Sequence, residues 1–463
     1  MKIVHQKYNV FSETLMSQLA QNGMSYRNIL YSIVTEVDGG ALLYHTLTRE
    51  ILFLTEQEYA GYVSGDMEKE LKTYLIENWF LVPEEFDERT FFYVVSGSYM
   101  DKSGNETRGD LRTATVFTTT GCNARCPYCY ESGVKPVSMS ADVAKDAAKY
   151  IVDHMSNHVH LKWFGGEPLV NSDVINIICN YLSEKGVSYN ASMTTNGYLA
   201  NEFDAHTIRD LWKIDNVQIT LDGLAETYDS VKSYKNEDHM AFDRVIQNIE
   251  YLCGIGVFVQ IRMNLSADNG DEIEKLIRYL EEHFAATPRI SIYTNPLFEG
   301  CGKPAHKPTK AEREKIYAKY LELERHISNG PLSGRYLVAG LRHNQCMADD
   351  GHSSCILPDG RLSLCEHHCE DETFGTIWSD EYDEAVFERW AEKEDRSKSC
   401  KTCFYFPQCF RLKHCETNPP CTDGLRKFYK FLLEQQAIRA YRNAEAQPQD
   451  THVLCCKFNT LVP

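Results

Sequence analysis

Cysteine spacing is the feature that most constrains this chain. Its 463 residues include 17 cysteines, and most of them fall into two groups, one near residue 125 and one between residues 346 and 421. The amino terminus lacks the apolar core of a secretory signal, so we expect a cytoplasmic protein whose thiols stay reduced. Reduced thiols at regular spacing indicate metal or cluster ligands rather than disulfides.

The net charge argues against a nucleic-acid partner. Acidic residues number 66 and basic residues 48, for a formal charge of −18, and no run of Lys or Arg is long enough to neutralise a phosphate backbone. No stretch of about 18 uncharged apolar residues is present, so no membrane span is expected. The length exceeds what one hydrophobic core usually fills, which predicts two or three domains.

A small α+β domain is predicted for residues 1–97. Two β-rich runs, 29–37 and 41–55, flank the turn signal Asp38-Gly39-Gly40 and predict a hairpin.

Helical periodicity follows the hairpin. Apolar residues three and four apart predict helices over 55–63 and 67–82, the second ending at Pro83. The polar stretch 96–110 contains glycines and predicts a linker to the next domain.

Residues 113–335 predict a parallel sheet. Six short apolar strands alternate with amphipathic helices such as 141–155 and 271–284. This alternation predicts an α/β fold in which the sheet curls into a partial (β/α)6 barrel. Functional loops of such folds lie at the carboxyl ends of the strands. The predicted strands are 114–120, 160–166, 188–195, 216–223, 257–265 and 289–295.

Residues 340–463 predict a cysteine-rich domain followed by a helix. Short segments with few apolar residues carry these cysteines, so metal centres are expected to take the place of a large core. The segment 422–444 predicts a helix that packs back on the body of the protein.

A loop directly after the first predicted strand of the sheet carries Cys122, Cys126 and Cys129. Three thiolates from one tight loop can hold three irons of a 4Fe–4S cube and leave the fourth iron open to a small molecule that bears an amine and a carboxylate. A zinc site is the alternative, but zinc takes four ligands, usually in paired spacing.

This C-x3-C-x2-C loop after the first strand of a (β/α)6 barrel resembles the signature of the radical S-adenosylmethionine (SAM) superfamily. The resemblance implies a 4Fe–4S cluster on the three cysteines, with SAM bound at the open iron. It also implies that Tyr128, the aromatic residue between the last two cysteines, lies beside the adenine of SAM. The alternative for Tyr128 is a residue that only packs the loop.

Motifs at other strand ends match the same family. Gly165, Gly166 and Glu167 follow the second strand, where the family holds the methionyl amine of SAM; the glycines allow close backbone approach and the glutamate offers a carboxylate. Thr220 ends the fourth strand and matches a position that meets the SAM carboxylate. Lys232 stands where the family commonly carries Arg, and its alternative is a solvated surface lysine.

The carboxyl-terminal cysteines resemble the SPASM extension of radical SAM enzymes that act on peptides and proteins. Eight thiolates suffice for two auxiliary 4Fe–4S clusters with four ligands each. The pairing implied by the resemblance is Cys346, Cys355, Cys365 and Cys415 for the first cluster, and Cys400, Cys403, Cys409 and Cys421 for the second.

One spacing departs from the SPASM pattern, because five residues separate Cys409 from Cys415 where the family usually has three. Exchange of ligands within the pair of clusters therefore stays open, Cys369 is a further competitor, and a zinc ribbon at Cys400 and Cys403 is an alternative. Three other cysteines are expected to be small buried hydrophobic residues, namely Cys179, Cys253 and Cys301.

Glu366 follows Cys365 at the position where sulfatase-maturing relatives carry an Asp that takes up a substrate proton. The resemblance implies a general base at this position. A solvated acid is the alternative, and His367 or His368 can fill the same role.

These resemblances imply an enzyme that generates a 5′-deoxyadenosyl radical and modifies a ribosomally made peptide by a thioether or carbon–carbon crosslink, an oxidation or an epimerisation. The amino-terminal hairpin and helices resemble a leader-peptide-binding domain, in which the peptide adds a strand to a sheet edge. Expected partners are a precursor peptide or protein substrate and an electron donor such as flavodoxin or ferredoxin. The alternatives are an anaerobic maturase that oxidises Cys or Ser of a sulfatase to formylglycine, and a non-catalytic iron–sulfur electron carrier.

Overall fold

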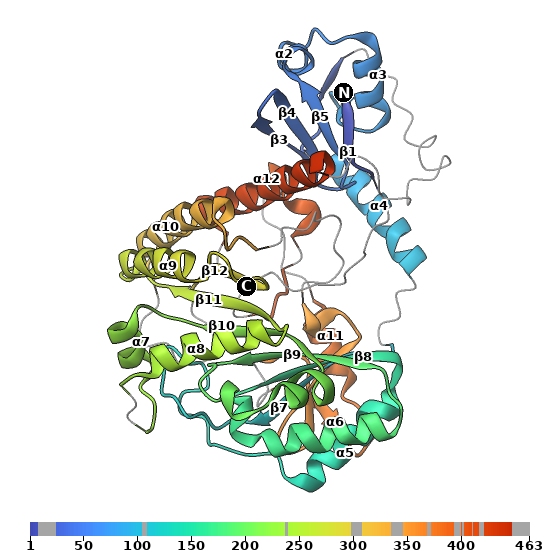
Figure 1. Ribbon diagram of the computed structural model, residues 1–463. Coiled ribbons are helices and arrows are strands. Elements are labelled where there is room, and N and C mark those ends of the chain that lie inside the picture. The colour runs from blue at the N-terminus through green and yellow to red at the C-terminus, as the bar shows by residue number, and fades with distance from the viewer. Residues whose placement is uncertain are drawn as a thin grey trace.

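The computed structural model describes residues 1–7, 25–103, 109–236, 239–297, 308–334, 346–367, 372–392, 400, 402–409, 411–415 and 421–446. The strands form a four-stranded, a nine-stranded and a two-stranded sheet. Figure 1 shows the four-stranded sheet at one end of the molecule and the nine-stranded sheet at the other, with the long helix α12 (Asp423–Ala446) between them.

The four-stranded amino-terminal sheet is antiparallel, with strand order β1-β5-β4-β3. The predicted hairpin is confirmed, because Val37 pairs with Gly40 across a turn in which Gly39 has a positive φ of 80°. The second predicted β-rich run is divided by a turn at 46–50 into two strands. The strands of this region are β1 (Lys2–His5), β2 (Tyr26–Asn28), β3 (Ser32–Val37), β4 (Gly40–His45), β5 (Ile51–Thr55) and β6 (Leu81–Pro83).

Three helices accompany this sheet: α2 (Glu56–Ser64), α3 (Lys69–Glu77) and α4 (Glu88–Ser103). Helix α2 begins with a capping box in which Thr55 and Glu58 satisfy each other's backbone amides. The predicted linker 96–110 was wrong in its first half, since α4 continues through it to Ser103. Buried Phe91 and Phe92 anchor this helix in an aromatic cluster, a tertiary contact that local composition does not reveal.

The large sheet confirms the predicted partial barrel of parallel strands. Six strands pair in parallel in the order β12-β11-β10-β9-β8-β7, so each strand lies next to its neighbour in sequence. These strands are β7 (Leu111–Thr119), β8 (Met155–Gly165), β9 (Tyr189–Thr195), β10 (Ile214–Thr220), β11 (Phe258–Leu265) and β12 (Ile290–Pro296). Their carboxyl ends meet along one edge, where the predicted motifs gather.

Helices cover one face of this sheet, and alternating strand residues divide between the two faces. In β11, Val259, Ile261 and Met263 are fully buried in the main hydrophobic cluster with the helices. Because strand side chains alternate, Arg262 and Asn264 face the opposite side, which is the concave lumen of the barrel. The covering helices are α5 (Ala141–His154), α6 (Ser172–Glu184), α7 (Ala225–Lys232), α8 (Ala241–Gly254), α9 (Gly270–Phe284) and α10 (Lys310–Asn329).

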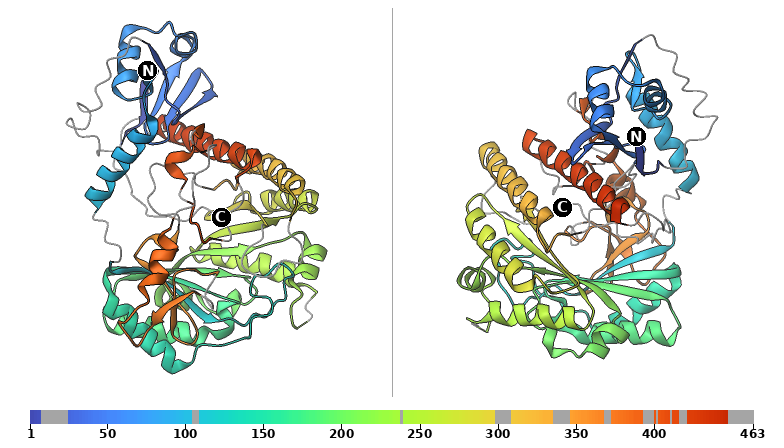
Figure 2. Two further views of the ribbon diagram at one scale, coloured as in Figure 1. Left: turned by 180° about the vertical axis from the view of Figure 1, so that it is seen from behind. Right: turned by 45° about the horizontal axis from the view of Figure 1, so that its top comes forward.

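The cysteine-rich region extends the same sheet. Strand β13 (Ser353–Ile356) pairs in parallel with β7, and β14 (Arg361–Ser363) and β15 (Thr373–Thr376) follow it, antiparallel to one another. Helix α11 (Glu384–Ala391) packs over these strands, as the view from behind in Figure 2 shows. The barrel and the cysteine-rich region therefore share one nine-stranded sheet.

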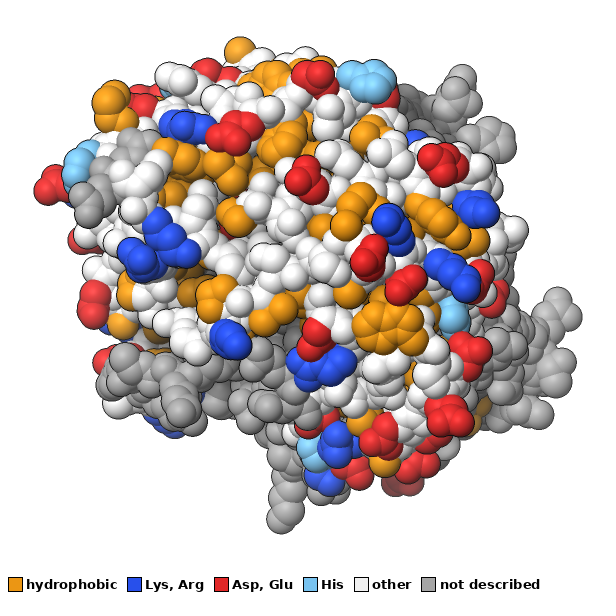
Figure 3. All heavy atoms as spheres, turned by 90° about the horizontal axis from the view of Figure 1, so that it is seen from below, with side chains coloured by type: hydrophobic (Ala, Val, Ile, Leu, Met, Phe, Trp, Pro, Cys, Tyr) orange, Lys and Arg blue, Asp and Glu red, His pale blue; other side chains and the backbone are white. Residues whose placement is uncertain are grey.

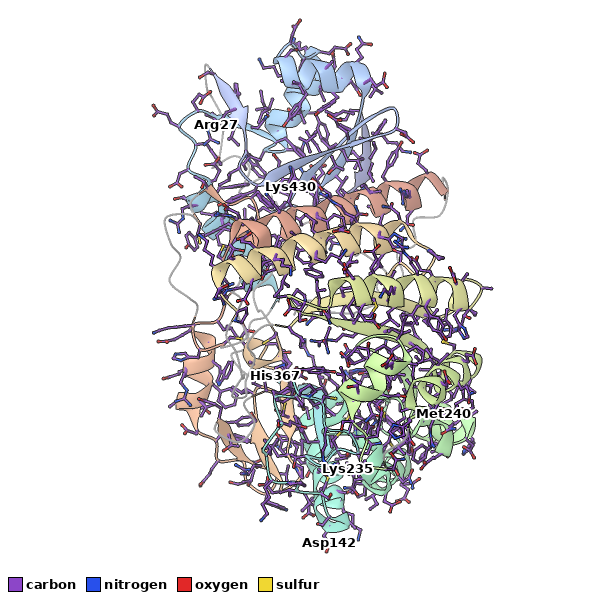
Figure 4. The ribbon with its side chains drawn as sticks, turned by 90° about the vertical axis from the view of Figure 1, so that its left-hand side faces the viewer. Arg27, Asp142, Lys235, Met240, His367 and Lys430 are labelled. Atoms are coloured by element: carbon purple, nitrogen blue, oxygen red, sulfur yellow. The ribbon has the colours of Figure 1, made fainter. Side chains whose placement is uncertain are left out.

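Helix α12 packs back on the protein as predicted. Leu433 and Ala437 are fully buried against the amino-terminal sheet, and Tyr441 stacks on Phe53 with ring centroids 5.0 Å apart. Figure 4, where Lys430 of α12 is labelled, shows this helix running beside α10 beneath that sheet. Among the described helices, none is both long and apolar enough to cross a membrane.

The surface seen from below carries charges of both signs. In Figure 3, acidic and basic side chains are interspersed with hydrophobic ones over this face. Neither positive nor negative side chains predominate on this face.

Candidate functional site

The three cysteines of the first group lie in one loop after β7. Cys122, Cys126 and Cys129 are each half-buried, and the amide of Cys129 donates to the carbonyl oxygen of Cys126 at 3.2 Å. Burial, with the charges of Glu167 and the other two cysteines, raises the pKa of the Cys122 thiol to about 12, and burial also raises the pKa of Cys129. The Cys122 and Cys129 thiols therefore retain their protons unless a metal takes their place.

The three thiols are candidate ligands for a multi-iron cluster or for a single ion. Within the described ranges, no three His, Cys, Asp or Glu side chains converge on one point in the way that a lone metal ion requires. Zinc would draw its thiolates to about 2.3 Å of one centre, whereas each thiolate of an iron–sulfur cube binds a different iron.

Two glycines bring the end of β8 against the cysteine loop. A Cβ on Gly165 would lie 2.1 Å from the carbonyl oxygen of Thr119, and one on Gly166 would lie 2.5 Å from that of Gly121. The amides of Gly166 and Glu167 donate to these same oxygens at 3.0 Å. The close approach seen in the structure is thus to the cysteine loop itself, and contact with SAM stays a prediction for both glycines.

Glu167 ties the ends of β8 and β9 together. Its side chain is fully buried, and its carboxylate accepts hydrogen bonds from the Thr195 hydroxyl and the Asn196 amide, each at 2.7 Å. A third bond comes from the Leu169 amide at 3.1 Å. Burial raises the pKa of Glu167, although these hydrogen bonds oppose that shift. Its predicted contact with the amine of SAM is not tested by this geometry.

Tyr128, Asp222 and Lys232 form a buried polar triad beside the loop. The Tyr128 hydroxyl donates to Asp222 at 2.5 Å, and the Lys232 ammonium lies 2.9 Å from the same carboxylate and 3.1 Å from the tyrosine oxygen. Lys232 is 3% exposed, which excludes the surface-lysine alternative. Burial disfavours its charge, but Asp222 and Tyr128 hold the pKa of Lys232 well above its usual value.

Residues of β10 and β11 continue this network into the lumen. Asn264 donates to Asp222 at 3.0 Å and accepts from Nε of Arg262 at 3.1 Å. Thr220, which is half-buried, pairs in register with Arg262. Sequence reasoning gave no role to Asp222, Asn264 or Arg262. The polar residues at every second position of 260–264 nevertheless indicate that Arg262 and Asn264 face the same side of a strand.

Glu366 lies beside Lys162 of β8. Its carboxylate is 2.5 Å from the Lys162 ammonium, and both side chains are mostly buried, at 21% and 25% exposed. Burial raises the pKa of Glu366, but Lys162, with His367 and Arg262 nearby, holds it below its usual range. This carboxylate is therefore ion-paired rather than a freely solvated acid, and its role as a base stays a prediction.

An aromatic contact joins the two cysteine regions. The ring of Tyr130, next to Cys129, meets His367 edge to face with centroids 4.7 Å apart. Figure 4 labels His367, which lies on the carboxyl-terminal segment beside the barrel strands. His368 and Cys369 lie outside the described residues.

The first predicted auxiliary group draws on separate segments. Cys355 lies on β13 and is fully buried, and Cys365 follows β14. Cys346 is exposed as a residue, but burial of its thiol, together with the charges of Asp349 and Cys415, raises its pKa to about 12. The structure thus brings Cys346 close to Cys415, while ligation by all four thiols stays a prediction.

The second predicted group lies against the amino-terminal region. Burial raises the pKa of Cys403, and the nearby Cys421 and Cys400 raise it further. Cys409 follows in the next turn, its amide donating to the carbonyl oxygen of Phe406 at 3.2 Å. The division of these cysteines between clusters stays a prediction.

Side chains of the amino-terminal region hold this second group. Phe406 stacks on Tyr31 with centroids 6.3 Å apart and meets Phe92 edge to face at 4.9 Å. The Gln408 amide donates to the carbonyl oxygen of Thr46 at 3.0 Å, within the buried interface. Sequence reasoning missed this contact because about 360 residues separate its two sides.

The expected burial of two isolated cysteines is confirmed. Cys179 and Cys253 are 0% and 6% exposed within the main hydrophobic cluster. Cys301 lies outside the described residues.

The central part of the chain is similar in sequence to known proteins. Residues 116–280 match the family model of the Radical SAM superfamily. Uncharacterized protein MJ0907 of Methanocaldococcus jannaschii is 29% identical over 164 residues, which cover 35% of this chain and 56% of that protein. A probable GTP 3′,8-cyclase of Methanocella arvoryzae is 29% identical over 179 residues, or 37% of this chain and 53% of its own length. The chain thus spans about half the length of these curated relatives.

Among solved structures, native anSMEcpe with bound AdoMet and Cp18Cys peptide is similar in fold. The TM-score is 0.53 at 17% identity, and the match covers 72% of this chain and 99% of that one. At this identity the likeness concerns the fold, and it extends well beyond the family match in the barrel.

Proposed function

We propose that this chain, in which residues 116–280 form a radical SAM superfamily domain, uses SAM and a 4Fe–4S cluster to modify a ribosomally made peptide. Cys122, Cys126 and Cys129 would hold the cluster, and with SAM bound beside it the cluster would supply radical chemistry at a substrate carbon. The observation that carries the proposal is the half-buried loop of Cys122, Cys126 and Cys129 at the carboxyl end of β7.

The residues around this loop would bind and orient the cofactor. Lys232 and Asp222 fix the Tyr128 ring beside the loop, and Glu167 fixes the ends of β8 and β9. These buried contacts hold the site in one geometry before a substrate arrives, which is how positioning contributes to rate. Apolar walls limit water in the same space, because Phe117 and Phe164 pack edge to face with centroids 5.2 Å apart.

A peptide substrate is supported by two further observations. The amino-terminal sheet has β1 and β3 as its edge strands in the described residues, and an extended peptide can add to such an edge through backbone hydrogen bonds. The fold is also similar to that of anSMEcpe, which was solved with a bound peptide. In this proposal the eight carboxyl-terminal cysteines would hold two auxiliary clusters, which would supply electron transfer, with a donor such as flavodoxin or ferredoxin as the partner.

A second candidate is the oxidation of Cys or Ser in a protein to formylglycine. It is favoured by Glu366, which lies next to Cys365 and stays ionised beside Lys162. An ionised carboxylate is in the form that accepts a proton, and release of its ion pair with Lys162 by a bound substrate would raise its basicity.

The first test is the iron and sulfide content of the anaerobically reconstituted chain, paired with release of 5′-deoxyadenosine on addition of SAM and dithionite. About twelve irons are expected from one three-cysteine and two four-cysteine sites. A variant with Cys122, Cys126 and Cys129 all replaced by Ala should lose about four irons and all SAM cleavage.

The matched control is Cys253→Ala, which removes a buried thiol outside every proposed cluster and should keep iron and activity. Zinc in place of iron, or SAM cleavage that survives in the triple variant, would contradict the proposal. A chain that holds iron but releases no 5′-deoxyadenosine would be an electron carrier instead.

A further inference from the structure

Two buried or mostly buried lysines of the site, Lys232 and Lys162, are already paired with carboxylates. Lys232 lies 2.9 Å from Asp222, and Lys162 lies 2.5 Å from Glu366. A buried ammonium that gives up its partner leaves a carboxylate without compensation, which is costly in a site of low dielectric. Neither lysine is therefore well placed to receive a further anion.

Arg262 differs from both lysines. It is half-buried on the lumen face of β11, and among the described residues no carboxylate lies within 4 Å of its guanidinium. Within the described structure, the single hydrogen bond of its side chain runs from Nε to the Asn264 side chain at 3.1 Å. Since a guanidinium carries five donors, the two terminal nitrogens are left to form a fork.

The charge of Arg262 acts inside the lumen. Burial raises the pKa of Tyr293, its neighbour in register on β12, and Arg262 opposes that shift. The guanidinium thus lies close to a group of the neighbouring strand that faces the same side of the sheet.

Hydrogen bonds orient Arg262 toward the cysteine loop. Asn264, which accepts from Arg262, donates to Asp222 at 3.0 Å, and Asp222 accepts from Tyr128 of the loop at 2.5 Å. On the other side, Thr220 of β10 pairs in register with Arg262. A carboxylate bound here would therefore contact both the guanidinium and the threonine hydroxyl, at the end of the lumen where the cysteines lie.

We propose that Arg262, rather than Lys232, binds the methionyl carboxylate of SAM. This inference rests on the proposed function, because it assigns a residue to the cofactor of that reaction. Arg262 forms a bidentate pair with the carboxylate, and Lys232 acts as a positioning residue that holds Asp222 and Tyr128. Lys232 thus stands where the family commonly carries an arginine, and Arg262 on the next strand, β11, takes over the binding of the carboxylate.

The test compares binding of two ligands that the enzyme does not cleave. S-adenosylhomocysteine keeps the carboxylate of SAM, and decarboxylated S-adenosylhomocysteine lacks it. Affinities are measured by anaerobic calorimetry on the reconstituted full chain for wild type, Arg262→Gln and Arg262→Lys. The matched control is Arg278→Gln, which removes an exposed arginine on α9.

Arg262→Gln should weaken binding of S-adenosylhomocysteine at least tenfold, with iron content and visible absorption unchanged. The decarboxylated ligand should bind equally to wild type and to this variant, and Arg262→Lys should recover part of the loss. The control should match wild type with both ligands.

Equal affinity of wild type and Arg262→Gln for S-adenosylhomocysteine would overturn the assignment, and so would an equal loss for both ligands. In either case the proposed function stands, because wild type still binds the ligand. A wild-type chain that holds iron but binds neither ligand would overturn the proposed function and this assignment together.

Discussion

The two cysteine regions of this protein are held in different ways. The loop of Cys122, Cys126 and Cys129 comes from one stretch of eight residues and is hydrogen-bonded to the ends of neighbouring barrel strands. The carboxyl-terminal cysteines come from segments far apart in sequence, some on the barrel sheet and some against the amino-terminal region. The first site is thus built by the barrel, whereas the second site joins parts of the molecule that are distant in sequence.

This difference has a consequence for assembly. The backbone hydrogen bonds from Gly166 and Glu167 to the barrel loop join protein groups only. We therefore expect them to form whether or not iron is present. The cysteines of the second region come from separate segments of the chain, so metal ligation is expected to contribute more to its order. Three substitutions test whether this contrast holds.

The largest effect is expected for Lys232→Met, which removes the cation under the barrel loop. It leaves Asp222, 4% exposed, without its ion pair, and breaking a buried pair in this way costs about 3–5 kcal/mol. Chemical denaturation of the reconstituted protein measures the loss.

Two control variants accompany this measurement. Lys275→Met, at a mostly exposed lysine of α9, should change stability by less than about 0.5 kcal/mol. The double variant Lys232→Met/Asp222→Asn should recover much of the loss, because it removes both charges. If the single variant is as stable as wild type, the loop does not depend on this triad.

A smaller effect, on activity, is expected for Gly165→Ala. The new Cβ would collide with the Thr119 carbonyl oxygen, and the φ of +120° at this position disfavours any residue with a side chain. Displacing the cysteine loop by about 1 Å should lower SAM cleavage about a hundredfold. Gly186→Ala, at a helix end with a positive φ but open space, is the matched control. Normal cleavage by Gly165→Ala would show that the loop tolerates movement.

The smallest effect is expected for Gln408→Ala at the second region. This change removes the buried hydrogen bond to Thr46 and should weaken docking of the amino-terminal region by about 1 kcal/mol. Hydrogen exchange should then rise in residues 25–96 and stay unchanged in the barrel strands. A uniform rise in hydrogen exchange would mean that residues 25–96 and the barrel strands unfold as one cooperative unit, which would contradict the proposed difference between the two cysteine regions.

The sequence by itself determined much of the barrel. The alternation of short apolar strands with amphipathic helices predicted all six parallel strands, because a strand and the helix after it form one βα unit of a parallel sheet. The spacing of Cys122, Cys126 and Cys129 placed a cluster loop after the first of them, since short-range spacing survives folding unchanged. The helical end of the stretch 96–110 was missed, because its support is a distant aromatic cluster.

Only the tertiary structure decided which partners the charged groups take. The sequence indicates that Lys232 replaces a ligand-binding arginine, but in the fold Lys232 is buried and forms an ion pair with Asp222. Arg262 has no distinguishing signal in sequence. It becomes a candidate because the sheet register sets it beside Thr220, and because three hydrogen bonds connect it to Tyr128 through Asn264 and Asp222. The physical reason is that pattern encodes which face a residue takes, whereas pairing of charges depends on distances between strands that meet only after folding.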